Sequence, residues 1–413
     1  MRIIYLFSLM ILASFTAPEI MHVNASDYTL SIFGNANMDD VIDESDIAYV
    51  EGIIEGTNEE TELADAKHDG VIDEDDIAQI ELIIDRTESE LTIVDSANRT
   101  LTIEKPVKTI IVVSGHAAEA IRILGSENKL AGVSNIIKKK DYYFSDLSDL
   151  PSVGDWKVGD YEAIAALDPD LVISYANWPP ISEVEENLNN FGIPVIALEF
   201  TNPSIITEEI EKLGYLLDER DNAKKYSIWN ERYKVMIDEF VCELSEDEKP
   251  RTFLETAYSG PGDISTYGTG TKADIGLSMV GGKNIADILQ ISYPHVDSEW
   301  VINEDPDVII KYVMSSEVEW GWNSTETPES LVNSVINRDG WEYLKAVKDG
   351  RVYLISNEVM EGPDGIVGYL FWTKMLHPEF DADPVAAYRE YLSDILVLEC
   401  PDLIFSYPET DAA

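Results

Sequence analysis

Basic side chains are scarce in this chain of 413 residues, which has 29 Lys and Arg against 79 Asp and Glu and a formal net charge of −50. A surface this acidic repels phosphate backbones and anionic lipid head groups, which disfavours nucleic acid and membrane surfaces as partners. The acidity fits either adaptation to high salt, where repulsion is screened, or simply an acidic, calcium-rich surface protein. Hydrophobic residues still make up 45% of the chain, enough for two or three folded domains.

Long apolar runs are also missing beyond the N-terminus, so no internal membrane span is predicted. Residues 1–25 are typical of a secretion signal, with a positive end at Arg2, an apolar core and a small-residue cleavage site at 23–25. We therefore expect an exported protein, secreted, extracellular or associated with the cell surface. Cysteine is limited to Cys242 and Cys400, which fit either one disulfide or two unpaired thiols.

Catalytic motifs are missing as well. The chain has no G-x-S-x-G nucleophile elbow, no H-E-x-x-H zinc motif and no G-x-x-x-x-G-K phosphate loop. It has five histidines in all, which disfavours a zinc site with several histidine ligands. We therefore do not expect an enzyme. A metal inserter of the chelatase type is the enzymatic alternative, and turnover of a chelate would be its signature.

An acidic repeat with an offset of 30 residues is present near the N-terminus. Segment 35–46 aligns with 65–76, and apolar residues at helical spacing follow each. Side-chain oxygens at loop positions 1, 3, 5, 9 and 12, with a backbone carbonyl at position 7, are typical of a calcium loop. Two acidic helix N-termini are the alternative. The predicted Ca²⁺ ligands are Asn35, Asn37, Asp39, Val41, Asp43 and Asp46 in the first loop and Asp65, Asp69, Val71, Asp73 and Asp76 in the second.

Both loops end in Asp rather than Glu, and segment 28–34 is too short and β-branched for an entering helix. This duplication of a loop followed by a helix, over residues 28–88, resembles the dockerin family. The resemblance implies an all-α module that binds Ca²⁺ and docks onto a cohesin-like partner. Asp40 stands in place of the usual turn glycine. Lys67 replaces an oxygen ligand, so the second site is expected to be weaker unless Lys67 points outward.

From residue 91 onward, β-branched runs alternate with helical segments, which predicts parallel sheets with helical crossovers. Segment 164–173 matches 300–310, because in each a helix ends, a proline turns the chain and a buried strand begins. Two such units predict two lobes of similar architecture, with a cleft at the carboxyl ends of their strands. Between them, a long helical stretch broken near 218–221 would restrict hinge motion.

Several short motifs resemble, in family order, the helix-bridged class of extracellular solute-binding proteins that feed ABC importers of iron chelates and corrinoids. Among them are Tyr267-Gly268-Thr269-Gly270, 281–287 and Gly340-Trp341. The implied fold class is α/β: two Rossmann-like lobes joined by a long helix and preceded by the small all-α module. The expected parts are a lobe over 91–205, a linker helix over 206–246, a lobe over 247–395 and a tail over 396–413. We expect a monomer.

Aromatic and polar side chains lie on the loops that would face the cleft. The expected ligand-binding residues are His116, Trp156, Tyr175, Trp178, Tyr258, Tyr267, His295, Trp320, Trp322 and Glu361. Flat rings give area on which a large conjugated or macrocyclic ligand can stack, although packing in a core is the alternative for each single ring. Trp320 and Trp322 lie in a loop-like stretch, where exposed aromatics favour binding.

His116, His295 and Glu361 could ligate a metal or take an axial position on a chelated one, whereas hydrogen-bonded loop histidines are the alternative. Anionic siderophores need Arg or Lys, which are scarce, and Gly362-Pro363-Asp364 has Asp where related proteins often have Arg. This favours a neutral or cationic chelate of iron or cobalt: a ferric siderophore of the hydroxamate type, a corrinoid or a haem-like compound. The cluster Lys138-Lys139-Lys140 is interpreted as a solvated face.

The resemblance also implies an ABC importer permease as partner, whose arginines meet glutamates on the lobe surfaces. Glu119 lies where the glutamate of the first helix falls in that family, and Glu255 is the candidate on the second lobe. An ordinary solvated carboxylate is the alternative for both. The competing function is a cell-surface scaffold or adhesion protein that docks through the calcium-dependent module and keeps a vestigial cleft.

Overall fold

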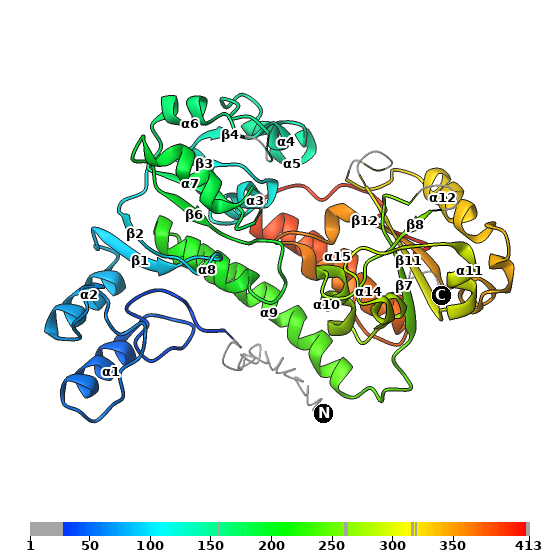
Figure 1. Ribbon diagram of the computed structural model, residues 1–413, viewed down its shortest axis with the longest axis horizontal. Coiled ribbons are helices and arrows are strands. Elements are labelled where there is room, and N and C mark those ends of the chain that lie inside the picture. Colours follow the sequence, from blue (N-terminus) through cyan, green and yellow to red (C-terminus); the bar gives the residue numbers. More distant parts are fainter. Residues whose placement is uncertain are drawn as a thin grey trace, which may run out of the picture.

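The computed structural model describes residues 28–155, 157, 159–177, 179–259, 263–314, 318 and 320–409. The expected signal at 1–25 and two candidate ligand-binding residues, Trp156 and Trp178, lie outside the described residues. Two α/β lobes and a small acidic module all contact a pair of helices that crosses the molecule (Figure 1). Within the described ranges, no helix has the length and apolar character that crossing a bilayer requires.

The N-terminal lobe is built on a four-stranded parallel sheet with the strand order β4-β3-β5-β6. Buried apolar runs form its strands, which are β3 (Ile110–Val112), β4 (Leu130–Val133), β5 (Leu171–Ser174) and β6 (Val195–Ala197). Its helices are α3 (Gly115–Ile123), α4 (Asn135–Lys138), α5 (Asp141–Phe144), α6 (Tyr161–Leu167) and α7 (Ile181–Asn189). An antiparallel hairpin, β1 (Glu90–Val94) and β2 (Thr100–Glu104), precedes the lobe.

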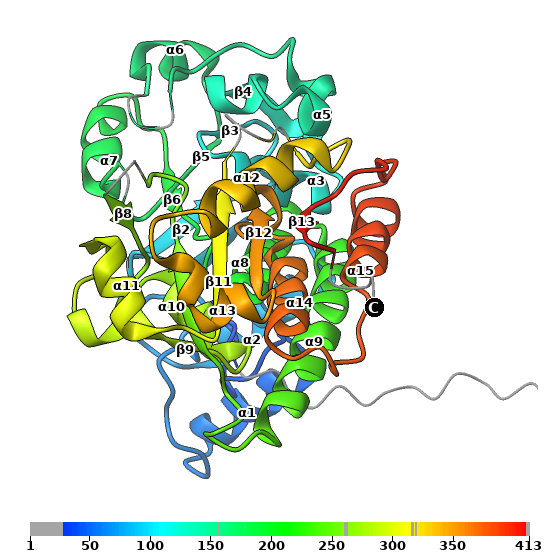
Figure 2. The ribbon, with the colours of Figure 1, turned by 90° about the vertical axis from the view of Figure 1, so that its right-hand side faces the viewer.

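The C-terminal lobe contains a five-stranded sheet with the order β13-β12-β11-β7-β9, and helices lie on both of its faces (Figure 2). Its strands are β7 (Arg251–Glu255), β9 (Lys283–Asn284), β11 (Val308–Val313), β12 (Val352–Ser356) and β13 (Ser406–Tyr407), with a separate pair β8 (Ile264–Ser265) and β10 (His295–Val296). Its helices are α10 (Lys272–Met279), α11 (Ser298–Glu304), α12 (Glu326–Ile336), α13 (Lys345–Lys348), α14 (Gly365–Leu376) and α15 (Pro384–Glu390). Part of the expected C-terminal tail belongs to this lobe, because β13 pairs antiparallel with β12 at the sheet edge.

The repeated proline signal marks equivalent turns in the two lobes. Helix α6 ends at Asp168 with φ 49°, and α11 ends at Asp305 with φ 42°, both in the left-handed region that Asp tolerates. A proline follows each turn, and β5 or β11 then enters its sheet. The same local sequence therefore begins a central strand in each lobe.

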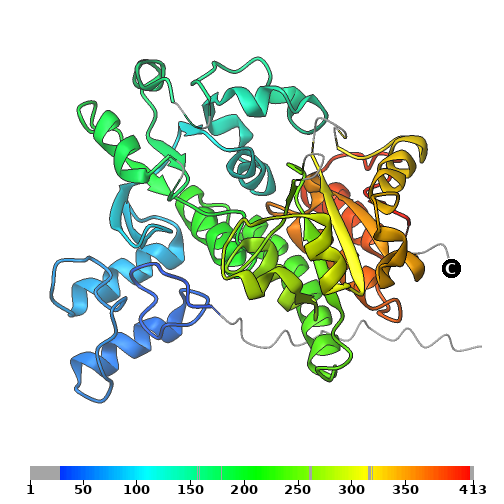
Figure 3. The same cartoon turned by 45° about the vertical axis from the view of Figure 1, so that its right-hand side comes forward.

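Two helices, α8 (Ile206–Leu217) and α9 (Arg220–Cys242), join the lobes (Figures 1 and 3). The chain breaks between them at Asp218, whose φ is 64°. A Cβ at Gly214 would lie 2.6 Å from the Cβ of Ala223, so glycine is what lets α8 and α9 approach this closely. The linker is therefore a packed helix pair rather than one long helix.

The acidic module repeats one hydrogen-bond pattern in two loops, each followed by a helix, α1 (Glu44–Ile54) and α2 (Glu74–Asp85). The Asp46 carboxylate accepts hydrogen bonds from the amides of Asn37 and Asp43, at 3.1 and 2.9 Å. Asp76 accepts the equivalent bonds from Lys67 and Asp73, at 3.0 and 2.8 Å. The duplication that the sequence shows is therefore also a duplication of local structure, and the Lys67 side chain is exposed.

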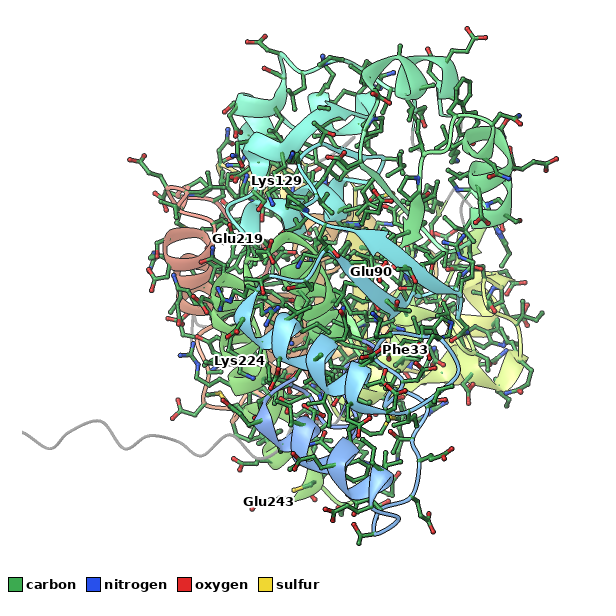
Figure 4. The ribbon with its side chains drawn as sticks, turned by 90° about the vertical axis from the view of Figure 1, so that its left-hand side faces the viewer. Phe33, Glu90, Lys129, Glu219, Lys224 and Glu243 are labelled. Carbon is green, nitrogen blue, oxygen red and sulfur yellow. The ribbon has the colours of Figure 1, made fainter. Side chains whose placement is uncertain are left out.

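The module packs onto the linker helices instead of standing apart from them. Its apolar residues belong to the same buried cluster as those of α8. The amide of Ile42 donates a hydrogen bond to the Tyr215 hydroxyl at 3.0 Å, and the Arg220 guanidinium lies 4.1 Å from the centre of the Tyr215 ring. Figure 4 shows the module against the helix pair, with Lys224 of α9 near it; the Lys224 ammonium lies 3.6 Å from Asp40.

Neither cysteine is in a disulfide. Cys242, at the end of α9, is exposed, and Cys400 is half-buried. The structure therefore agrees with two unpaired thiols and not with one disulfide, and the thiol of Cys242 is exposed.

Candidate functional site

Two adjacent hollows lie at the carboxyl ends of the sheet strands, where the lobes meet. The larger is a cavity of about 360 Å³, lined by Thr201 from the N-terminal lobe and, from the other lobe, by Tyr267, Gly270, Thr271, Lys272, Ala273, Ser292, Tyr293, Tyr312, Met360, Glu361 and Tyr369. The smaller, which we call the acidic recess, has a volume of about 40 Å³. Its lining is Gly115, His116, Glu119, Lys140, Tyr143, Phe144, Trp320, Asn357, Glu358, Glu361 and Asp364. Glu361 belongs to both linings.

His116 enters the recess because a short turn joins β3 to α3. The Ser114 side chain caps α3 by accepting a hydrogen bond from the Ala117 amide at 3.0 Å, which places His116 in the first turn of the helix. Burial, together with the positive Lys140 and Lys272, lowers the pKa of His116 to about 3. The imidazole is therefore neutral at physiological pH and offers one donor and one acceptor nitrogen.

The C-terminal lobe approaches His116 through Gly362, which has a φ of 112°. A Cβ at this position would lie 2.8 Å from Cδ2 of His116. Glycine is therefore required here both for its backbone conformation and for the close contact between the lobes.

Glu119 is buried between the lobes and not on the surface. It is 6% exposed, and its Oε1 accepts hydrogen bonds from the hydroxyls of Tyr143 at 2.9 Å and Tyr391 at 2.5 Å. Burial raises its pKa to about 7, although the two hydrogen bonds and Lys140 act in the opposite direction. Burial also raises the pKa of Asp364 well above its usual value, and the nearby Glu119 adds to this.

Two ion pairs join the N-terminal lobe to the C-terminal lobe across the cleft. Lys140, after α4, lies 2.6 Å from Oε2 of Glu358, which also accepts a hydrogen bond from Tyr142 at 3.1 Å. Lys272, at the start of α10, lies 3.2 Å from Oε1 of Glu199 and also contacts the Thr201 hydroxyl. The prediction of a solvated lysine cluster is therefore wrong for Lys140.

The structure brings together part of the predicted ligand-binding set. His116 and Trp320 line the recess, Tyr267 lines the cavity, and Glu361 lines both. Tyr175 is not in either lining, but its hydroxyl lies 3.5 Å from Nδ1 of His116, which lines the recess.

Three other predicted residues lie outside these linings. Tyr258 is 75% exposed, and His295 forms a hydrogen bond with Asp263 at 2.9 Å. Trp322 packs in a small core of the C-terminal lobe. Trp320 and Trp322 are 7% and 4% exposed, so the expectation of exposed aromatics is wrong for both. The motif Trp320-Gly321-Trp322 is loop-like, but Trp322 pairs with Ile404 of the C-terminal segment, which covers it.

The two glutamates predicted to meet a permease are both inaccessible. Glu119 lies in the interlobe interface, and Glu255 is 0% exposed at the end of β7. The Glu255 carboxylate pairs with Lys311 and Arg338, each at 2.7 Å. The prediction of surface contacts is wrong for both residues, because their partners lie within the protein.

A metal site formed directly by side chains is not assembled. In the part of the chain that the structure describes, no three residues among His, Cys, Asp and Glu are grouped to hold a metal ion. His295 lies outside the linings that hold His116 and Glu361, so the predicted trio is not formed. Each of the two histidines has a hydrogen-bond partner, which was the alternative.

Sequence reasoning missed Lys140, Glu358 and Asp364 as site residues. A signal was present for Asp364, because it follows Gly362-Pro363 at the position where an arginine was expected. No comparable signal existed for Lys140 and Glu358, which are 218 positions apart and meet through the packing of two lobes.

Comparisons with known proteins agree with this architecture. The family model described as periplasmic binding protein matches residues 110–359. The chain is 26% identical over 260 residues to an uncharacterized ABC transporter substrate-binding lipoprotein of Bacillus subtilis, which covers 61% of this chain and 74% of that protein. It is 26% identical over 195 residues to a vitamin B12-binding protein of Vibrio parahaemolyticus, covering 47% and 68% of the two chains. The fold is similar to the TroA-like periplasmic binding protein FepB from Veillonella parvula, with a TM-score of 0.68 and 21% identity over 76% of this chain and 98% of that one.

Proposed function

The chain belongs to the periplasmic binding protein family, and on this premise we propose that it captures a metal chelate between its lobes and delivers it to an ABC importer. The observation that carries the proposal is the ring-lined cavity at the interlobe cleft. Its volume of about 360 Å³ lies within the range of small-molecule sites. The rings of Tyr267, Tyr312 and Tyr369 offer flat apolar area, and Glu361 adds a polar group.

The ligand class that we propose is an iron or cobalt chelate, namely a ferric siderophore, a corrinoid or a haem-like compound. The vitamin B12-binding relative supports this class. The comparisons favour this function over the scaffold alternative, because the relatives described above are substrate-binding or periplasmic binding proteins.

The test is a titration of the intrinsic tryptophan fluorescence with cobalamin, haem and a set of ferric siderophores. One compound is expected to quench the emission saturably with one-to-one stoichiometry. Trp320 lines the recess and Trp322 is buried elsewhere, so Trp320→Phe should reduce the quenching amplitude and Trp322→Phe should preserve it. Absence of binding by every compound would contradict the proposal, and turnover of a chelate would point to the enzymatic alternative.

We also propose that the module over residues 28–88 binds Ca²⁺. The donor set fits a hard cation, because both loops are rich in carboxylates and the Lys67 side chain is exposed and leaves the second loop free. Asp46 is fully buried, and burial raises its pKa to about 6, as expected for a carboxyl group without a nearby cation. Because the described residues hold no assembled metal cluster, binding would have to draw the loop side chains inward.

Calorimetric titration of the full chain with Ca²⁺ tests this proposal. Asp43→Asn should weaken the first site and Asp73→Asn the second, so the two variants act as controls for each other. If neither substitution changes the heat of Ca²⁺ binding, the assignment of the two loops as Ca²⁺ sites is wrong. Docking onto a cohesin-like partner is tested separately, by Ca²⁺-dependent binding to an immobilised cohesin module that a chelator reverses.

A further inference from the structure

The acidic recess contains more carboxyl groups than the surrounding protein pairs with cations. Four carboxyl groups line it, those of Glu119, Glu358, Glu361 and Asp364, against the single ammonium of Lys140. Lys140 pairs with Glu358 at 2.6 Å. Within the described ranges, the other three carboxyl groups form no ion pair. His116 supplies no charge, because it remains neutral.

Two of these carboxyl groups have oxygens without a hydrogen-bond donor, and the Tyr388 hydroxyl satisfies only part of the Asp364 carboxyl group. Asp364 is 2% exposed, and its Oδ1 has no hydrogen-bond partner in the described part of the chain. The Glu361 carboxylate, open to both hollows, likewise forms no hydrogen bond or ion pair there. A buried acceptor without a donor is costly, so Oδ1 of Asp364 indicates a donor that arrives from outside the chain, and the exposed Glu361 carboxylate is accessible to the same group.

The size of the recess limits what those donors can be. Its volume of about 40 Å³ holds a group of only a few heavy atoms. The indole of Trp320 and the ring of Phe144 form part of its wall, so apolar surface lies beside the carboxyl groups. Because Glu361 also lines the cavity of about 360 Å³, a ligand in that cavity can extend a short arm into the recess.

We infer that the acidic recess binds an organic cation, an ammonium or guanidinium group, which projects from a chelate held in the larger cavity. The inference rests on the function proposed above for the cleft. Such groups carry several N–H donors and no acceptor, which matches carboxyl oxygens that need donors. A bare metal ion is disfavoured, since no three ligating side chains converge in the part of the chain that the structure describes. An anionic arm would meet four carboxyl groups and only one ammonium, that of Lys140, which Glu358 already pairs.

The first experiment tests the recess without any chelate. Saturation-transfer NMR compares butylammonium with N-butylacetamide, its neutral acetylated form, on the full-length wild-type protein. We expect a signal from butylammonium only, and its loss in Glu361→Gln and in Asp364→Asn. Glu329→Gln, an exposed carboxylate on α12, is the matched control and should retain the signal. No signal from butylammonium, or equal signals from both compounds, would overturn the inference.

The second experiment connects the recess with the cleft. It compares two linear ferric trihydroxamates that differ only at one end, where one carries a free ammonium and the other an acetylated amine. The ammonium form should bind about tenfold more tightly or better to the wild type, as expected for a charge-assisted hydrogen bond. Asp364→Asn should abolish this preference and leave the affinity of the neutral form unchanged.

The outcomes of the two experiments separate the inference from the proposed function. Equal affinities for the two chelates overturn the cationic recess but leave a chelate-binding protein. If butylammonium binds and neither chelate does, the cation site stands and the proposal fails for trihydroxamates. Circular dichroism spectra identical to wild type confirm that each variant is folded.

Discussion

Glu119 is a carboxyl group that the interlobe interface keeps partly protonated near neutral pH. Its pKa is raised to about 7, chiefly by burial, whereas Tyr391, Tyr143 and Lys140 lower it and Glu358 raises it further. A folded-state pKa above the unfolded value means that the folded protein binds the proton more tightly. The resulting stability is fully present below the unfolded pKa of about 4.5 and is lost as the pH rises through about 7.

We therefore predict that the free energy of unfolding increases as the pH falls from about 8 to about 5. Glu119→Gln should flatten this slope, because the amide stays neutral and its oxygen can still accept from Tyr143 and Tyr391. Urea denaturation of both proteins at several pH values measures the difference between them. Subtracting one curve from the other cancels the effect of the surface carboxylates, which both proteins share. If the variant has the same pH dependence of the unfolding free energy as the wild type, Glu119 ionises normally.

Substitution of Gly362 tests the contact between the lobes by adding a single Cβ atom. Gly362→Ala would force a Cβ to within 2.8 Å of His116 and place alanine at a φ of 112°. We expect a loss of roughly 1–3 kcal/mol in stability and a weaker affinity for the chelate.

The matched control is Gly350→Ala, because Gly350 also has a positive φ, of 69°, but no atom within 4 Å of an added Cβ. This variant should lose only about 1–2 kcal/mol from its backbone and retain chelate affinity. Chemical denaturation and chelate titration measure the two effects. Equal behaviour of the two variants would mean that the lobes separate easily at this point.

The limits of sequence reasoning are clearest at this scale. His116 could be predicted, because it follows a buried strand at a helix start, and Glu361 because it follows a strand in the other lobe. Glu119 could not be placed correctly, since periodicity gives a helical face but not which lobe covers it. Trp320 was predicted as exposed, but the Tyr388 hydroxyl accepts its indole N–H at 2.7 Å inside the protein.

At the scale of elements, Tyr215 connects the acidic module to the linker helices. Its hydroxyl accepts a hydrogen bond from the Ile42 amide, next to the first loop. Tyr215→Phe should cost about 1 kcal/mol and accelerate hydrogen exchange at Ile42. Tyr226→Phe is the control, because the Tyr226 hydroxyl donates to the Pro363 carbonyl elsewhere in the interior. If exchange in the first loop responds equally to both, the module is not held through Tyr215.

Secondary structure was more predictable than the site was. β-branched runs and proline turns gave the central strands of both lobes, because these are local patterns that follow from steric rules. The edge strand β13 could not be predicted, because two residues in a polar C-terminal segment are too few to show the alternation typical of a strand. Its pairing depends on β12, which is more than 50 positions earlier in the chain.

At the scale of the whole molecule, the net charge of −50 dominates the electrostatics. Raising KCl from about 0.1 M to about 1 M shortens the screening length from about 10 Å to about 3 Å and should weaken the repulsion between carboxylates. Exposed ion pairs lose little, because each contributes little.

We therefore predict that the melting temperature rises with KCl at pH 8 and that this rise becomes smaller near pH 5, where carboxylates begin to protonate. Differential scanning calorimetry at the two pH values measures both effects. A melting temperature that falls with salt would show that attractive pairs outweigh the repulsion.

The packing of the acidic module onto α8 and α9 has a consequence for orientation. If a flexible linker joined the module to the lobes, the lobes could adopt any orientation relative to it. Because the module shares a buried core with the linker helices, it cannot rotate independently of the lobes. In Figure 1 the helix pair lies between the module and most of the two lobes. A partner that binds the module therefore also fixes the orientation of the cleft. The direction in which the bound ligand is presented is then determined by how the module is attached.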